Sequence, residues 1–343
     1  MVRMATTLQD VARQAGVSMK TVSRVVNDEP NVADDTRRQV LRVVAEMGYV
    51  PHLQAQRLAS GKTRSIALHY PLWDPGLITN EIEMNFITGI ALGAAEDSYF
   101  FSLMTGELTH AGLLKLCRGA QADGLILMQV ALEDWRVNLL RDNAYPFVMI
   151  GRTADNDGLT YIDLDFERAI AEAYAHLIRL GHRHIGFLTF SDEWRRRGLG
   201  PAMRSLRGLH LAADKYGLTP IYRECQLEVE RACGVTTQLL LEHPELTAFV
   251  AMHNTITVGA IRALNGVQRQ VPRDCSIVGV AISKEAELII PPLTALDFSA
   301  YDVGRQAAHM LIDDLSGGCH GPKQVLVGPK LQVRQSTSRM GSG

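Results

Sequence analysis

A glycine turn near residue 16 is the feature that most constrains how the chain begins. Apolar residues before it recur with helical spacing on one face, at Leu8, Val11, Ala12 and Ala15. Gly16 can take the left-handed backbone conformation that ends a helix. Ser18 is a good N-cap for a second helix, from Met19 to about Val26. Two short helices joined by such a turn predict a helix-turn-helix unit.

A third short helix is predicted from about Asp34 to Met47, and Gly48 ends it. Its inward residues are expected to be Val40, Leu41, Val43, Val44 and Met47. Three helices of this kind can share a small core. Residues 1–50 are therefore expected to form an all-α domain.

The second helix directs a polar face outward. Its N-terminal residues would enter the major groove of DNA. There Lys20 or Arg24 could donate to guanine O6 and N7, and Met19 offers an apolar surface to a thymine methyl. Ser18, Thr21 and Asn27 are short polar residues suited to contact phosphate oxygens. Such contacts fix the position of the protein on the duplex and do not read its sequence. A single polar face of this kind is usually only solvated, so the interpretation depends on its coincidence with the turn, the caps and the charge.

Charge is distributed unevenly along the chain. Residues 1–64 contain ten Lys and Arg against six Asp and Glu, a net charge of +4. The whole chain has a formal charge of −2, so the remainder carries −6. A basic head on an acidic body indicates that only the head meets a polyanion.

The head resembles a known family over a long motif. The matching residues are Thr7 to Ala12, Ala15 to Ser18, Thr21 to Asn27, Val32, Thr36-Arg37, Gly48 to Pro51, Ala55 and Leu58. This pattern is similar to the DNA-binding head of the LacI/GalR repressor family. The resemblance implies that Met19, Lys20 and Arg24 read bases. The predicted DNA contacts are Thr7, Leu8, Ser18, Met19, Lys20, Thr21, Ser23, Arg24, Asn27, Asn31, Thr36, Tyr49, Ala55 and Leu58.

Residues 51–64 are predicted to be a hinge. Pro51 favours a first helical turn, and a short helix from His52 to Ser60 would end at Gly61. A helix this short is not stable alone in water. The resemblance implies that two hinges of a dimer form together in the minor groove, where Leu58 wedges between base pairs. A plain linker role for Leu58 stays open, and His52 stands where the family usually has Asn.

The body is predicted to be α/β. Apolar runs of four to six residues recur at intervals of about 20–40 residues, as parallel strands with crossover helices do. These units are too many for one sheet, so two subdomains with a cleft are expected. The resemblance continues through Asp165, His176 to Ile178, Gly181-His182, Pro291 to Thr294 and Leu331 to Thr337.

This second resemblance implies a two-lobed sensor, similar to periplasmic sugar-binding proteins. Residues 65–336 would form an effector-binding and dimerisation domain, followed by a tail at 337–343. Lobe 1 would span about 65–165 and 297–324, and lobe 2 about 166–296 and 325–336. The chain would cross between lobes near 165, 296 and 325.

Ligands of open α/β sheets lie beyond the carboxyl ends of strands. The residues predicted to bind an effector are Trp73, Asp74, Phe190, Trp194 and Asn254. Asn254 lies where the family places an effector-binding Asn, although packing roles for the aromatic residues stay open. Two positions depart from the family. Ser205 replaces an Arg, and Ala281-Ile282 replace an acidic pair, so charged partners for sugar hydroxyls would be lost. A sugar or sugar derivative, a less polar ligand, a protein partner and no ligand all stay open.

Other classes of protein are disfavoured. No run reaches about 18 apolar residues, and Gln9, Asp10, Arg13 and Gln14 interrupt any signal-peptide core. A cytoplasmic protein without membrane contact is therefore expected. The five cysteines form no CxxC pair, and no metal or cofactor is expected. No GxSxG, GxxxxGK[ST] or HExxH motif is present, which argues against an enzyme.

The predicted function is sequence-specific regulation of transcription, as a repressor that binds a pseudo-palindromic operator. A homodimer is expected, because the chain ends soon after Thr337 without the leucine heptad tail of the family's tetramers. A small molecule in the cleft would control DNA binding. Whether it releases DNA or promotes binding stays open. The alternative is a small-molecule receptor whose DNA-binding head is vestigial.

Overall fold

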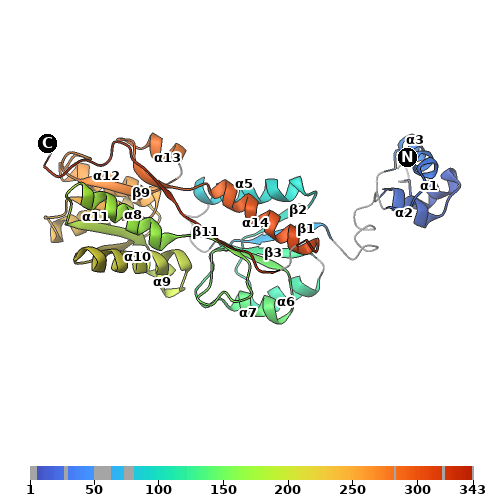
Figure 1. Cartoon of the computed structure of the whole chain (residues 1–343), viewed down its shortest axis with the longest axis horizontal. Coiled ribbons are helices and arrows are strands. Elements are labelled where there is room, and N and C mark those ends of the chain that lie inside the picture. Colours follow the sequence, from blue (N-terminus) through green and yellow to red (C-terminus); the bar gives the residue numbers. More distant parts are fainter. Residues whose placement is uncertain are drawn as a thin grey trace. The chain divides into compact units, whose positions relative to one another are not determined.

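The computed structural model describes residues 6–26, 30–49, 63–72, 81–119, 121–281, 283–318 and 321–341. It contains two compact units, Met1–Thr63 and Arg64–Gly343, called here the head and the body (Figure 1). Several predictions fall outside the described residues. They are the hinge up to residue 62 and the site residues Asn27, Ala55, Leu58, Trp73 and Asp74.

The head contains the three predicted helices, α1 (Leu8–Ala15), α2 (Met19–Val26) and α3 (Asp34–Met47). Thr7 caps α1 in a capping box with Asp10, which satisfies backbone N–H groups that the first turn leaves without partners. Gly16 ends α1 with φ of 64°, in the left-handed region that favours glycine. The helices enclose a core of Val11, Ala12, Ala15, Val22, Val25, Val40, Val43 and Tyr49.

Leu41 is a correction to the predicted core, because its side chain is 48% exposed. The buried residues of α3, Val40 and Val43, recur at helical spacing, and Leu41 lies about 100° around the helix from Val40. Tyr49, which follows the helix and is 9% exposed, is the residue of this core that the predicted inward face of α3 did not include.

Lobe 1 of the body is built on a six-stranded parallel sheet with the order β11-β5-β4-β3-β1-β2. Its strands are β1 (Ser65–His69), β2 (Phe100–Met104), β3 (Gly124–Leu127), β4 (Phe147–Ile150), β5 (Tyr161–Leu164) and β11 (Gln324–Val327). Its helices are α5 (Glu81–Glu96), α6 (His110–Arg118), α7 (Trp135–Asp142) and α14 (Ala300–Leu315). Helices α5 and α14 pack closely, since a Cβ at Gly89 would lie 2.1 Å from the Tyr301 carbonyl oxygen.

Lobe 2 is built on a second six-stranded sheet, with the order β12-β10-β9-β8-β6-β7. Its strands are β6 (Ile185–Phe190), β7 (Ile221–Cys225), β8 (Ala248–Ala251), β9 (Ser276–Val280), β10 (Thr294–Asp297) and β12 (Lys330–Gln332), of which β12 is antiparallel to β10. Its helices are α8 (Phe166–Arg179), α9 (Asp192–Arg196), α10 (Gly200–Tyr216), α11 (Val229–Glu242), α12 (Asn254–Gly266) and α13 (Ser283–Leu288). Strands β6, β8 and β9 are buried throughout, as parallel strands covered on both faces are.

The chain passes between the lobes three times: after β5, after β10 and between β11 and β12. The last passage lies at residues 328–329 rather than near 325, because Val325, Leu326 and Val327 pair with β5 in lobe 1. The two-lobed α/β fold with parallel sheets is confirmed. Among the helices described, none has the length and apolar character needed to cross a membrane.

Candidate DNA-binding face and interlobe cavity

The first turn of α2 presents an exposed polar face. The Ser18 hydroxyl accepts a 3.1 Å hydrogen bond from the Thr21 backbone N–H and lies 2.9 Å from the Thr21 hydroxyl, which fixes where α2 begins. Met19 is 52% exposed and Lys20 is also exposed, while Val22 and Val25 on the opposite side are buried. Apolar packing therefore holds this end of α2 with its N-terminal side chains directed to solvent.

The remaining predicted DNA contacts in the head differ in exposure. Thr7 and Asn31 are exposed, and Asn31 adopts a left-handed φ of 71°. Leu8, Ser23, Arg24 and Thr36 are partly exposed. Tyr49 is buried in the core, where burial raises the pKa of its phenol. Tyr49 thus supports the fold of the head, and its role in DNA binding stays a prediction.

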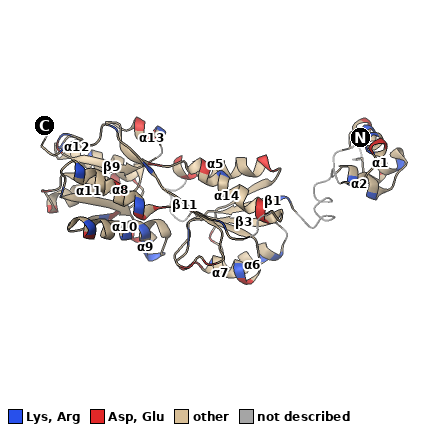
Figure 2. Ribbon diagram, viewed as in Figure 1, with Lys and Arg blue, Asp and Glu red and all other residues tan. Residues whose placement is uncertain are grey.

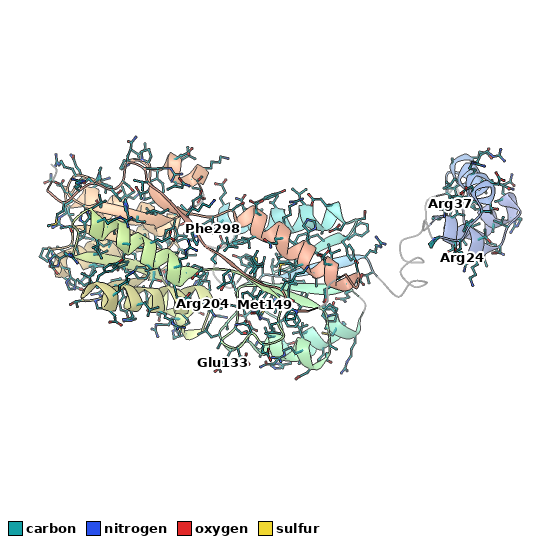
Figure 3. The ribbon with its side chains drawn as sticks, in the orientation of Figure 1. Arg24, Arg37, Glu133, Met149, Arg204 and Phe298 are labelled. Atoms are coloured by element: carbon teal, nitrogen blue, oxygen red, sulfur yellow. The ribbon has the colours of Figure 1, made fainter. Side chains whose placement is uncertain are left out.

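Side chains of opposite charge lie close together on α1 and α3 of the head (Figure 2). Exposed ion pairs join Arg13 to Asp10 on α1, and Arg38 to Asp35 and Arg42 to Glu46 on α3. The residues of α2 include Lys20 and Arg24 and no Asp or Glu. Figure 3 labels Arg24 on this helix. The basic character of α2 suits contact with a polyanion.

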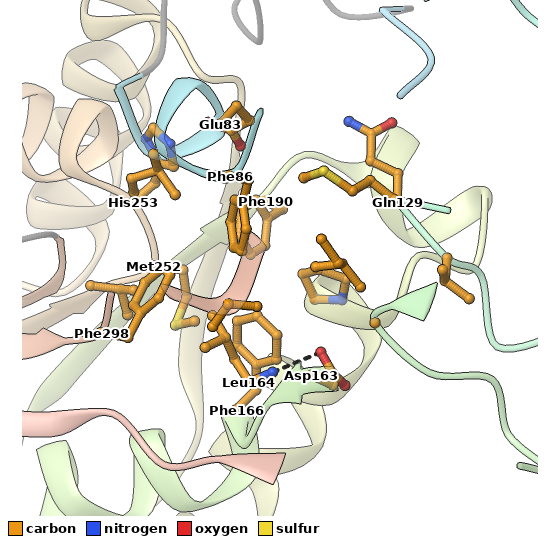
Figure 4. Close-up of a pocket in the computed structure, with 18 of the residues that line it drawn as sticks. Glu83, Phe86, Gln129, Asp163, Leu164, Phe166, Phe190, Met252, His253 and Phe298 are labelled. Atoms are coloured by element: carbon orange, nitrogen blue, oxygen red, sulfur yellow. Dashed lines mark hydrogen bonds between the residues drawn. The ribbon is translucent and has the colours of Figure 1, made fainter. Parts of the chain in front are cut away.

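A cavity of about 110 Å³ lies between the lobes of the body (Figure 4). Aromatic rings form much of its wall: Tyr70, Phe86, Phe166, Phe190, Trp194 and Phe298. Phe190 and Trp194 are stacked with ring centroids 4.6 Å apart. The polar residues of the wall are Glu83, Gln129, Asp163 and His253.

Hydrogen bonds between the lobes close one side of this cavity. The backbone N–H of Gly200 donates to the Val130 carbonyl over 2.9 Å, and that of Leu132 donates to the Gly198 carbonyl over 2.8 Å. Arg197 of lobe 2 also pairs with Glu107 of lobe 1 over 3.3 Å. These contacts join the loop after β3 to the start of α10, so the lobes are held together in this structure.

A buried charged cluster lies at the edge of the cavity beside Asp163. Arg152 donates to the Asp163 carboxylate over 3.0 Å, and Arg204 donates to the Thr153 carbonyl over 3.0 Å. Burial raises the pKa of Asp163 to about 6, against the opposing effect of Arg204 and Arg152. Arg204, labelled in Figure 3, is a buried cation of lobe 2 that contacts lobe 1. It is the neighbour of Ser205, the position where an Arg was expected from the family resemblance.

Ser205 itself has a packing role. It is completely buried, donates to the Ala202 carbonyl over 3.0 Å and lies 3.0 Å from the Thr189 hydroxyl. The loss of an Arg at this position does not remove positive charge from the interlobe region, because the neighbouring Arg204 supplies it.

Acidic residues gather at another side of the cavity. Burial raises the pKa of Glu83 to about 8, and the nearby Glu285 carboxyl adds to that rise. Burial and the charge of Glu81 raise the pKa of Glu285 to about 7. The Asn254 amide also lies beside Glu285, and its side-chain oxygen accepts from the Thr255 backbone N–H over 2.8 Å. Both lobes contribute to this group, since Glu81 and Glu83 are on α5 and Glu285 is on α13.

Of the effector-binding residues that the sequence predicted, Phe190 and Trp194 line the cavity. Asn254 is outside the lining, which its neighbour His253 joins instead. Burial lowers the pKa of His253 to about 4, so this ring is neutral near pH 7.

Sequence reasoning missed several lining residues. Gln129 and Phe298 follow β3 and β10 closely, so the rule that ligands bind at carboxyl ends of strands could have found them. Glu83, Phe86 and Phe166 come from helices, and no sequence pattern marks them. Among the described residues, no group of three His, Cys, Asp or Glu side chains could hold a metal ion.

Two family models match the chain: bacterial regulatory proteins, lacI family, over residues 7–52, and the periplasmic binding protein-like domain over residues 174–337. The HTH-type transcriptional regulator AglR of Rhizobium meliloti is 30% identical over 356 residues, covering 97% of this chain and 95% of that protein. The HTH-type transcriptional regulator CelR of Thermobifida fusca is 28% identical over 339 residues, covering 96% and 98%. A solved CelR–cellobiose complex matches at 26% identity with a TM-score of 0.71, covering 96% of this chain and 99% of that chain.

Proposed function

The chain belongs to the lacI family of bacterial regulatory proteins and is a DNA-binding transcriptional regulator, and from this premise we propose that it represses transcription as a homodimer on a pseudo-palindromic operator. The observation that carries the proposal is the first turn of α2, where Met19 and Lys20 are exposed above a complete three-helix core. Two such heads related by a two-fold axis would read half-sites whose centres lie about 10 bp apart.

The residues of α2 have separate parts in this proposal. Lys20 and Arg24 donate to guanine in the major groove, and Met19 contacts a thymine methyl. Ser18 and Thr21 are near the helix N-terminus, where backbone N–H groups and hydroxyls suit phosphate oxygens. Base contacts then supply specificity, and phosphate contacts fix the register of the head on the duplex.

The interlobe cavity is the proposed effector site. A ligand that contacts both lobes favours one lobe arrangement over others, and any arrangement that also changes the geometry of the heads changes operator affinity. Phe190 and Trp194 are proposed to contact the ligand directly. Small-angle scattering with and without a bound ligand measures lobe closure, and an unchanged profile at saturation would count against this coupling.

Selection of DNA from a random pool tests the whole proposal. The purified full-length chain is incubated with the pool at low salt, where phosphate contacts are strongest, and the bound DNA is sequenced. We expect a palindromic site whose half-site centres are about 10 bp apart. A pool that stays random at low salt, with and without cell-extract metabolites, would contradict the proposal and favour a receptor with a vestigial head.

A further inference from the structure

The interlobe cavity has the wall of an apolar site. Of the twenty described residues that line it, sixteen are apolar, and six of those are aromatic. A sugar presents hydroxyl groups around its whole ring, and each hydroxyl that loses water needs a hydrogen-bond partner. Four polar side chains, the Tyr70 hydroxyl and the Trp194 indole N–H are few partners for the many hydroxyl groups of a disaccharide. The wall chemistry therefore favours a ligand with an apolar body.

The size of the cavity points the same way. Its volume of about 110 Å³ is below the roughly 150 Å³ of an apolar protein cavity that takes up benzene. A ligand of one six-membered ring with a short substituent therefore needs the lobes to part slightly, and a larger ligand needs them to part further. The stacked pair Phe190 and Trp194 offers a flat surface to such a ring.

Glu83 differs from Asp163 and His253, the other titratable residues of the wall. Asp163 accepts hydrogen bonds from the Leu164 backbone N–H and from Arg152, over 2.9 and 3.0 Å. His253 accepts from the Thr255 backbone N–H over 3.1 Å. The Glu83 Oε2 atom is buried and has no hydrogen-bond partner among the described residues. Figure 4 shows Glu83 and Asp163 on different sides of the pocket. Glu83 thus holds an unused hydrogen-bonding position beside the cavity.

The surroundings of Glu83 are acidic. The charge of Glu285 on α13 acts on Glu83, and the charge of Glu81, on the same helix as Glu83, acts on Glu285. Lys284 faces Glu81 at 3.9 Å, and both of those side chains are largely exposed. This side of the cavity therefore favours a positively charged group.

We propose that the cavity binds a compact ring compound that carries one protonated amine, with the ammonium group at Glu83 Oε2 and the ring among Phe86, Phe190 and Trp194. This inference rests on the proposed function of the cavity as the effector site. The ammonium group donates to the carboxylate, and aromatic faces around it add a cation–π attraction. Burial raises the pKa of Glu83 to about 8, so near pH 7 binding drives its proton to solvent.

Three probes separate this ligand class from the alternatives. Benzylamine has the ring and the cation, benzyl alcohol has the ring with a neutral donor, and cellobiose is a sugar. Titration calorimetry of the full-length chain at pH 7 in two buffers of different ionisation enthalpy measures affinity and proton release together. We expect benzylamine to bind with release of up to one proton, benzyl alcohol to bind about 10- to 100-fold more weakly without release, and cellobiose not to bind.

The Glu83→Gln variant tests the assigned residue. Gln keeps the shape of a neutral carboxyl group and cannot become negative. Benzylamine affinity should fall about 10- to 100-fold and proton release should disappear, while benzyl alcohol affinity stays within about twofold. Glu96→Gln is the matched control, since Glu96 is at the far end of α5, paired with Arg305 over 2.8 Å. This control should leave all three titrations unchanged.

Two results would overturn the inference: cellobiose binding in place of benzylamine, or benzylamine binding to wild-type protein without proton release. The wild-type titrations stand even where Glu83→Gln does not fold. Operator affinity measured with and without saturating benzylamine distinguishes the ligand class of the cavity from its role as the effector site. Benzylamine that binds at Glu83 without changing operator affinity supports the ligand class and contradicts the effector role.

Discussion

The head and the interlobe cavity offer opposite kinds of surface to the partners proposed for them. The proposed DNA-reading face lies on one helix turn, is exposed and basic, and is separate from the side of α2 that packs in the core. The cavity is assembled from helices and strand ends of two lobes, and most of its wall residues are also core residues of the body. Substitutions in the head should therefore change binding without unfolding it, whereas substitutions in the cavity should change stability and binding together.

The largest expected effect separates binding from stability in the head. Replacing both Lys20 and Arg24 with Ala should weaken binding to the selected operator by about 30- to 10⁴-fold, since each base contact contributes about 1–3 kcal/mol. Binding to unrelated DNA should fall far less. Gel-shift titration on both DNAs measures the two affinities, and circular dichroism checks that the helices remain.

The control for this pair is Arg42→Ala. Arg42 is exposed on α3 and pairs with Glu46 over 3.9 Å, outside the proposed face. Its replacement should change operator affinity by less than about threefold. Specific binding that survives in the Lys20 and Arg24 double variant would show that another element reads the operator.

A cavity residue should behave in the opposite way. Trp194 is 4% exposed and stacks on Phe190, so Trp194→Ala should lower the free energy of unfolding of the body by about 3–5 kcal/mol. All three tryptophans of the chain, Trp73, Trp135 and Trp194, belong to the body, so fluorescence of the remaining two reports its unfolding. Operator binding without ligand should stay close to wild type.

Leu241→Ala is the matched control, because Leu241 is 71% exposed on α11 and its truncation should change stability by less than about 0.5 kcal/mol. A Trp194→Ala variant as stable as wild type would mean that the cavity wall can relax around the loss. The separation of binding residues in the head from core residues in the body would then not hold.

Local signals explain why the head was predicted well. Three local features define the head: the cap at Thr7, the turn at Gly16 and the apolar spacing of α1 and α2. Each depends only on residues that are close in sequence, so the sequence alone indicates it. Leu41 was assigned wrongly because its neighbours Val40 and Val43 suffice to fill that side of the core. Periodicity alone does not say how wide the buried face is.

The cavity could be predicted only in part, because it depends on contacts between distant segments. Phe190 and Trp194 lie at and just after the carboxyl end of β6, where the strand-end rule predicts a ligand. Glu83 is in α5, and its raised pKa depends on burial and on Glu285, about 200 residues later in the chain. Likewise, the cation at Arg204 became visible only when the fold placed it beside Thr153.

The pH dependence of stability should also distinguish the two regions. In the folded body the pKa of Glu83 is raised from 4.5 to about 8. The folded state then binds more protons than the unfolded state, so stability falls as pH rises through this window. Glu285, raised to about 7, acts in the same direction. His253 and His69, both lowered to about 4, act in the opposite direction only below about pH 6.5.

Between pH 6.5 and 8 we therefore expect the body to lose stability by up to about 1.4 kcal/mol per pH unit from Glu83. Urea unfolding followed by tryptophan fluorescence at several pH values measures this slope. Glu83→Gln should flatten it. Glu96→Gln should leave the slope unchanged. Arg305 lowers the pKa of Glu96, so Glu96 does not titrate between pH 6.5 and 8. A slope unchanged in Glu83→Gln would show that Glu83 is ionised in the folded protein.

The smallest expected effect compares one backbone position in each region. Gly16 in the head has φ of +64° with open space around its Cα, so Gly16→Ala should destabilise the head by about 1–2 kcal/mol through strain alone. Gly234 lies within α11 of the body, also with open space, so Gly234→Ala should stabilise the body by about 0.5–1 kcal/mol. Thermal unfolding by circular dichroism, with tryptophan fluorescence for the body, measures both changes.

Because the added methyl group meets no neighbour in either case, opposite signs of the two stability changes would identify backbone conformation as the cause. A Gly16→Ala variant as stable as wild type would mean that the turn between α1 and α2 does not need a residue in the left-handed conformation.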